Sequence, residues 1–114
     1  MTLQRSRPGV QKHLTTLYME VLVSYDVATD TAAGRRRLRR VAQICLGYGQ
    51  RVQKSVFECS INEMQYEQLR DRLLKCIDTE EDNLRIYRLI GVREQHVEAY
   101  GVSRYVDFND SLVV

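Results

Sequence analysis

The sequence predicts an α+β fold in which two helices cover one face of an antiparallel sheet. Two long segments have the apolar spacing of amphipathic helices, and four short segments have the composition and alternation of strands. They follow one another in the order strand, helix, strand, strand, helix, strand, and a short turn at Lys54 joins the middle strands as an antiparallel hairpin. This order is the split βαβ arrangement of a ferredoxin-like domain.

The first strand is expected at residues 20–26, an almost uninterrupted apolar run that ends in the carboxylate of Asp26. Near-continuous apolarity is typical of a strand covered on both faces, so this strand should be central in the sheet. An acid at a strand end is by itself most often a turn or cap residue. With a cationic helix just beyond it, the same acid is also placed to hold a metal ion near a phosphate chain.

The first helix is expected to begin after Asp30 or Thr31, because either side chain can accept hydrogen bonds from the free N–H groups of a helix start. Residues 35–40 contain five arginines. Gly47 and Gly49 are expected to end the helix with positive φ. The residues expected to share its buried face are Leu38, Val41, Ala42, Cys45 and Tyr48.

Residues 51–53 and 55–61 predict the two strands of the hairpin. Asn62 and Gln65 have the spacing of a capping box, which predicts that the second helix starts there. Residues 84–90 predict the fourth strand. Because both helices cover the same face, the other face of the sheet is expected to meet a partner subunit.

The chain continues past the fourth strand. Residues 97–102 predict a short fifth strand, which we expect to add to the sheet edge of another protomer. We therefore divide the chain into a disordered extension (1–18), a ferredoxin-like domain with a swapped last strand (19–102) and a docking tail with an apolar end (103–114).

Charge and cysteine content narrow the function further. Residues 1–60 carry ten Lys/Arg and four Asp/Glu (10 − 4 = +6), whereas residues 61–114 carry seven and eleven (7 − 11 = −4), which suggests a face for a polyanion. Cys45, Cys59 and Cys76 are too widely spaced for a zinc site and odd in number, so we expect free thiols and a reducing cytoplasm. No segment approaches the roughly 20 apolar residues of a membrane helix.

The arginines of the first helix are the main candidates for phosphate contacts, namely Arg36, Arg39 and Arg40, with Arg51 from the following strand. A solvated charged face is the more common reading of such a run. Ser55 could donate to a phosphate or to a metal-bound water, or could simply be a turn serine. The sequence has no glycine-rich phosphate loop and no histidine-based constellation, which argues against nucleotide hydrolysis and a His-dependent nuclease.

Four segments together resemble a known family: Ser-Tyr-Asp-Val at 24–27, Arg-Leu-Arg-Arg-Val at 37–41, Tyr-Gly-Gln-Arg-Val-Gln-Lys-Ser-Val-Phe-Glu-Cys at 48–59, and Leu-Arg-Ile-Tyr-Arg-Leu at 84–89. They resemble the small CRISPR-associated adaptation protein that partners the spacer integrase, with the greatest likeness to members of the I-C subtype. The resemblance covers roughly Met19 to Val114.

The resemblance implies a symmetric homodimer of ferredoxin-like protomers in which the swapped last strand corresponds to Val97–Val102. It implies a metal-dependent endonuclease that acts on RNA or double-stranded DNA, with Asp26 of both subunits sharing one Mg²⁺. It also implies a role in CRISPR antiviral defence, in which the dimer bridges integrase subunits during spacer capture. Two alternatives stay open: a scaffold that binds nucleic acid without catalysis, and a toxin-like RNA interferase of the same fold.

Overall fold

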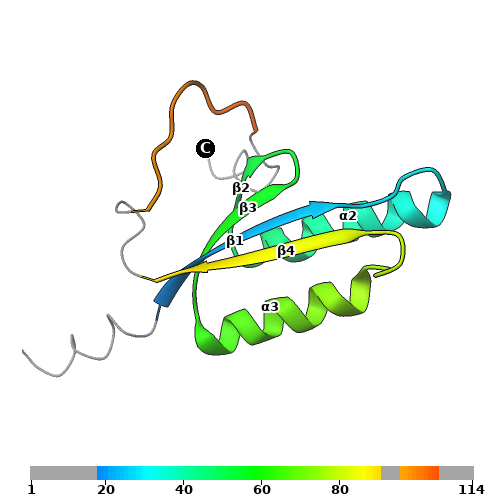
Figure 1. Cartoon of the computed structure of the whole chain (residues 1–114), viewed down its shortest axis with the longest axis horizontal. Helices are drawn as coiled ribbons and strands as arrows, with labels where there is room; N and C mark the ends of the chain where they lie inside the picture. Colours follow the sequence, from blue (N-terminus) through cyan, green and yellow to red (C-terminus); the bar gives the residue numbers. More distant parts are fainter. Residues whose placement is uncertain (1–17, 91–95, 106–114) are drawn as a thin grey trace, which may run out of the picture.

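The computed structural model describes residues 18–90 and 96–105 (Figure 1). The predicted element order is confirmed, and the sheet has the strand order β2-β3-β1-β4 of a ferredoxin-like domain. The elements are β1 (Tyr18–Asp26), α2 (Ala32–Leu46), β2 (Gln50–Gln53), β3 (Val56–Asn62), α3 (Glu63–Cys76) and β4 (Asn83–Leu89).

The central position predicted for the first strand is confirmed, because β1 pairs antiparallel with β3 on one side and with β4 on the other. Val23 lies opposite Phe57 in β3 and Ile86 in β4. β2 and β3 form the predicted hairpin, with an irregularity in the pairing between Arg51 and Gln53.

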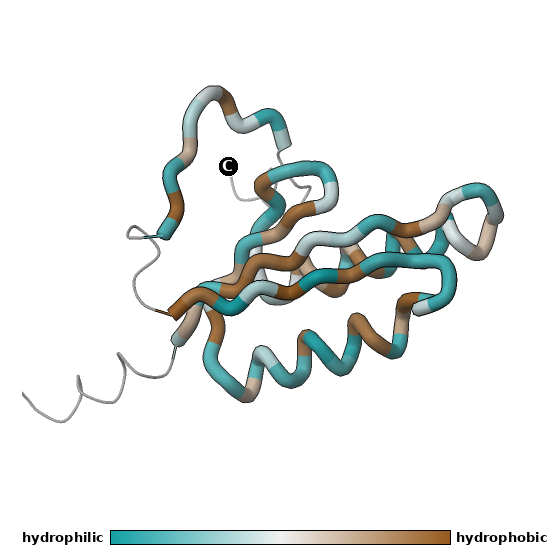
Figure 2. Tube along the Cα trace, in the orientation of Figure 1, coloured by the Kyte–Doolittle hydropathy of each residue, from teal (hydrophilic) through white to brown (hydrophobic). Residues whose placement is uncertain are grey.

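The two faces of the sheet differ in what covers them. Val21, Val23 and Tyr25 of β1 are buried in the core against the helices, which run side by side along one face (Figure 1). Alternate residues such as Leu22 point to the opposite face, which the helices leave uncovered. In the first half of β4, residues 83–86, polar and hydrophobic residues alternate accordingly (Figure 2). The core residues are Val21, Val23, Tyr25, Val27, Val41, Cys45, Phe57, Cys59, Ile61, Tyr66, Leu69 and Leu73.

Both helices begin with the predicted caps. The Thr31 hydroxyl accepts a hydrogen bond from the Gly34 N–H at 3.0 Å. Asn62 and Gln65 form a reciprocal capping box, in which each side chain accepts from the other's backbone N–H. These caps satisfy N–H groups that the first turn of a helix leaves without an intrahelical acceptor.

The predicted glycine ending of the first helix is wrong in its mechanism. Gly47 caps α2 with φ −72°, an ordinary helical value, and Gly101 is the only positive-φ glycine among the described residues. Gly49 is instead required because no side chain fits at this position. A Cβ there would lie 2.2 Å from the Glu58 carbonyl oxygen and 2.6 Å from the Cys59 Sγ, because the chain leaving α2 passes directly over β3.

Gly49→Ala is therefore expected to lower the free energy of unfolding by about 2–3 kcal/mol, as overpacking against rigid backbone does. Gly47→Ala is the matched control, since its nearest contact is 3.3 Å away and its φ suits any residue; we expect a change within about 0.5 kcal/mol. Urea unfolding followed by circular dichroism measures both. Equal effects at the two positions would contradict the space requirement at Gly49.

Residues 96–105 form no helix or strand in this single chain. The expected fifth strand at 97–102 therefore has no pairing here, and its exchange with a second protomer stays a prediction. The extension before Tyr18 and most of the proposed tail lie outside the described residues. Within the described ranges, no helix is both long enough and apolar enough to span a membrane.

Candidate functional site

Asp26 is the last residue of β1, and its side chain is exposed. It points away from the helices, because its neighbours Tyr25 and Val27 are buried in the core. In the register with β4 it lies opposite Asn83. Directly opposite residues of an antiparallel pair project their side chains to the same face, so the Asp26 carboxylate and the Asn83 amide are neighbours.

The loop that follows Asp26 is held by a second carboxylate, Asp82. Asp82 Oδ1 accepts hydrogen bonds from the Ala28 N–H at 3.0 Å and from Arg37 Nη2 at 3.2 Å. Its Oδ2 accepts from Arg37 Nε at 2.8 Å and from the Asp78 N–H at 2.9 Å. One carboxylate thus joins the loop after β1, the first turns of α2 and the loop before β4.

The electrostatics of the Arg37–Asp82 ion pair follow from its hydrogen bonds. The Asp82 side chain has no exposed surface, and that of Arg37 is 20% exposed. The hydrogen bonds from Arg37 lower the pKa of Asp82, and the hydrogen bond to Asp82 raises the pKa of Arg37, so both groups stay charged. Asp82 already accepts four hydrogen bonds, which makes it a structural anchor for the Asp26 end of the sheet, whereas Asp26 is exposed.

Ser55 lies in the turn between β2 and β3, beside the same end of the sheet. Its carbonyl oxygen accepts a hydrogen bond from the Tyr25 N–H at 3.2 Å, which places it next to the residue before Asp26. The backbone therefore brings Ser55 and Asp26 to the same end of the sheet. Tyr25 and Phe57 pack as stacked rings within the core, with centroids 6.2 Å apart.

Two residues near Asp26, namely Asn83 and Arg85, were not among the predicted site residues. Arg85 lies opposite Ser24 on the uncovered face, one alternation from Asp26 and Asn83, and donates to the Tyr87 hydroxyl at 3.3 Å. The alternation of residues 84–90 could have placed Arg85 on that face. The register that puts it beside Asp26 could not be read from the sequence, because it depends on how two distant strands pair.

The donor chemistry at Asp26 suits a hard cation in part. Carboxylate and amide oxygens are ligands of Mg²⁺, which usually keeps several waters and takes one or two carboxylates from a protein. Within residues 18–90 and 96–105, however, no group of three or more Asp, Glu, His or Cys side chains is arranged to hold a metal. One chain thus offers Asp26 and Asn83, and a second carboxylate would have to come from another copy.

The predicted arginines divide into two groups. Arg36, Arg39 and Arg40 are exposed on α2, as expected, and form no hydrogen bond or ion pair among the described residues. Arg51 is half-buried, with its guanidinium 5.1 Å from the centre of the Phe57 ring. The exposed α2 arginines therefore remain the strongest candidates for phosphate contacts, while Arg51 has a packing contact as well.

Comparison with known proteins identifies the family. The model of the family described as "CRISPR associated protein Cas2" matches residues 19–96. The chain belongs to the Cas2 family. A family member from Moorella thermoacetica named "CRISPR-associated endoribonuclease Cas2 1" is 56% identical over 96 residues, which cover 84% of this chain and 100% of that protein. One from Halalkalibacterium halodurans named "CRISPR-associated endonuclease Cas2" is 46% identical over 95 residues, covering 83% of this chain and 99% of that protein.

The Cas2 fold is also found among solved structures. The crystal structure of Streptococcus pyogenes Cas2 at pH 6.5 matches with a TM-score of 0.64 and 50% identity, covering 73% of this chain and 100% of that one. The family membership predicted from the four sequence segments is thus confirmed. The relatives' names describe nucleases, which agrees with the endonuclease activity that the resemblance implies.

Proposed function

We propose that this chain acts in CRISPR spacer acquisition as a homodimer that holds nucleic acid, bridges integrase subunits and hydrolyses phosphodiester bonds in RNA or double-stranded DNA with Mg²⁺. The observation that carries the proposal is the exposed Asp26 at the end of β1, on the face of the sheet that the helices leave uncovered. The nuclease names of the relatives support the same chemistry. We also propose that the chain is a member of the I-C subtype and acts in the cytoplasm.

The uncovered face of the sheet supports the homodimer. Besides its polar residues, this face carries partly exposed apolar side chains, including Leu22 and Leu89, and Tyr87 with 43% of its surface exposed. A second copy would bury them and would bring a second Asp26 toward the first. The paired carboxylates would then supply the ligands that a single chain lacks for Mg²⁺, which would offset the charge of phosphate oxygens.

Ser55 is proposed to orient a phosphate or a water at the Asp26 end of the sheet. Residues 97–102 are proposed to pair with the sheet of the partner subunit. A scaffold without catalysis uses the same dimer and the same arginines, and differs only in what Asp26 does. The endoribonuclease names favour one further candidate, a toxin-like RNA interferase of the same fold, which would be toxic on expression without an integrase.

Spacer acquisition in cells, measured together with solution mass and co-purification of the integrase, tests the proposal. Tyr87→Arg places a charge on the proposed dimer face and is expected to abolish acquisition and to reduce the mass from twice 13.3 kDa to that of one chain. Leu74→Arg, on the exposed side of α3, is the control and should retain spacer acquisition and the mass of the dimer. Asp26→Ala separates the roles: lost acquisition favours the enzyme, and retained acquisition favours the scaffold. A wild-type monomer would contradict the proposal altogether.

A further inference from the structure

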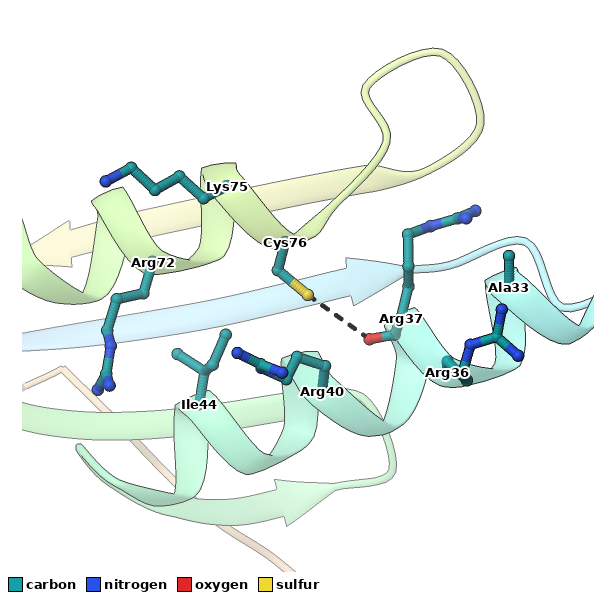
Figure 3. A pocket seen from close by; sticks show the side chains of 8 residues that line it. All are labelled: Ala33, Arg36, Arg37, Arg40, Ile44, Arg72, Lys75 and Cys76. Atoms are coloured by element: carbon teal, nitrogen blue, oxygen red, sulfur yellow. Dashed lines mark hydrogen bonds between the residues drawn. The ribbon is translucent and has the colours of Figure 1, made fainter.

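A groove of about 640 Å³ runs between α2 and α3, on the helix layer and therefore on the opposite side of the molecule from the uncovered sheet face (Figure 3). Cations come from both of its walls: Arg36 and Arg40 from α2, Arg72 and Lys75 from α3. Between them lie the small or apolar side chains Ala33, Ile44 and Cys76. The helices thus join the predicted arginine run to two cations that lie more than 30 residues further along the chain.

Few negative charges balance these cations. Asp71 pairs with Lys75 at 3.1 Å, in an exposed ion pair that contributes little. Arg37 also borders the groove, but its guanidinium is bound to Asp82 at the groove's end. Arg36 and Arg40 are one helical turn apart, a like-charge spacing that destabilises a helix. A solvated protein surface usually intersperses both signs, whereas this concave surface concentrates one.

The side chains are arranged for an extended anion. Figure 3 shows Arg72 reaching from α3 toward Ile44 on α2, and Arg40 lying in the space between the helices. Arg72 donates to the Tyr48 hydroxyl at 3.4 Å, a long contact that leaves most of its donors for a ligand. Arg36 and Arg40 are separated by about 6 Å along the helix axis, which suits successive phosphates of one strand.

We propose that the groove between α2 and α3 binds the phosphate backbone of a single nucleic-acid strand, through Arg36 and Arg40 on one wall and Arg72 and Lys75 on the other. Its volume of about 640 Å³ is that of a small-molecule site, roughly 300–1,000 Å³, so a single strand can lie in it. The charged side chains that line it are all Arg or Lys, which suit phosphates, so we expect binding that is independent of sequence. This inference rests on the proposed function, because both concern nucleic acid. The groove lies apart from Asp26, and it adds Arg72 and Lys75 to the residues proposed to contact phosphates.

The test is fluorescence anisotropy of the full chain with a short fluorescein-labelled oligothymidylate, in EDTA so that no metal-dependent step contributes. Arg72→Ala removes one groove cation, and Arg70→Ala removes one cation from the same helix outside the groove, where Arg70 lies over the Tyr66 ring. Each phosphate contact on a single strand contributes about −0.7 to the slope of log affinity against log salt. We therefore expect Arg72→Ala to flatten the slope by about 0.7 and to weaken binding about fivefold at 0.1 M salt, while Arg70→Ala changes neither.

Arg72→Lys, which keeps the charge, should restore the wild-type slope. Circular dichroism confirms the fold of each variant, and Arg72 is exposed, so its loss should not unfold the chain. Equal effects of Arg72→Ala and Arg70→Ala would overturn the groove as the site while leaving the proposed function intact. Displacement of the oligothymidylate by polyglutamate at equal charge concentration would overturn the choice of nucleic acid. Absence of binding by the wild type would overturn this inference, whereas the proposed function, which concerns RNA or double-stranded DNA, is tested separately by spacer acquisition and by cleavage.

Discussion

Purified protein that carries Asp26→Asn is expected to lose Mg²⁺-dependent cleavage of RNA and of double-stranded DNA, by about 100-fold or more, because the amide removes the negative charge that the carboxylate contributes to Mg²⁺ binding. The substitution keeps the shape of the side chain at the exposed end of β1, where Asp26 makes no internal hydrogen bond or ion pair among the described residues. The free energy of unfolding should therefore stay within about 0.5 kcal/mol of the wild type. Gel assays of labelled substrates with and without EDTA measure the effect.

Asp30→Asn is the matched control. Asp30 lies in the loop just after β1, is exposed, and loses the same charge when replaced. Cleavage at the wild-type rate by Asp30→Asn, together with its loss in Asp26→Asn, would assign the activity to the strand end rather than to net charge. If Asp26→Asn still cleaves in Mg²⁺ at the wild-type rate, Asp26 is not the ligand, and the scaffold role becomes the better account of this chain.

What the sequence predicted well depends on local patterns. The apolar run of β1, the stripe that contains Val41 and Cys45, and the capping box at Asn62 are set by neighbours within a few residues, and all three are confirmed. The predicted free thiols also fit, since Cys45 and Cys59 are buried and burial raises the pKa of each to about 12. Thiols with such pKa values are largely protonated and chemically inert at neutral pH.

What the sequence did not predict depends on contacts between distant segments. Arg37 was one of five similar arginines, and only its contact with Asp82, 45 residues away, separates it from Arg36 and Arg40. Asp82 was one acid in an acidic loop, with no local signal that it is buried. Arg72 joins the α2 arginines only because the two helices pack side by side. The Gly49 requirement has the same origin, since the backbone it approaches belongs to β3.

Asp82→Ala is expected to destabilise the fold more than any other single change at this end of the sheet. It removes an acceptor for the Ala28 and Asp78 N–H groups and leaves Arg37 without its carboxylate. Removing one partner of a buried ion pair costs about 3–5 kcal/mol; because Arg37 keeps some access to water, we expect about 2–3 kcal/mol. For a domain of this size that lowers the melting temperature by roughly 10 °C or more. Glu81→Ala, an exposed acid in the same loop, should change it by no more than about 2 °C.

The pH dependence of the free energy of unfolding shows whether Asp82 stabilises the fold through its charge or only through packing. Because Arg37 lowers the pKa of Asp82 in the folded chain, the stabilisation is fully present above the pKa of the unfolded carboxyl and is lost as pH falls through the lower, folded value. The stability difference between the wild type and Asp82→Asn should accordingly be constant near neutral pH and should narrow in acid below about pH 4. Urea unfolding at a series of pH values measures it. A difference that stays constant into strong acid would show that Asp82 acts through its shape and hydrogen bonds rather than through its charge.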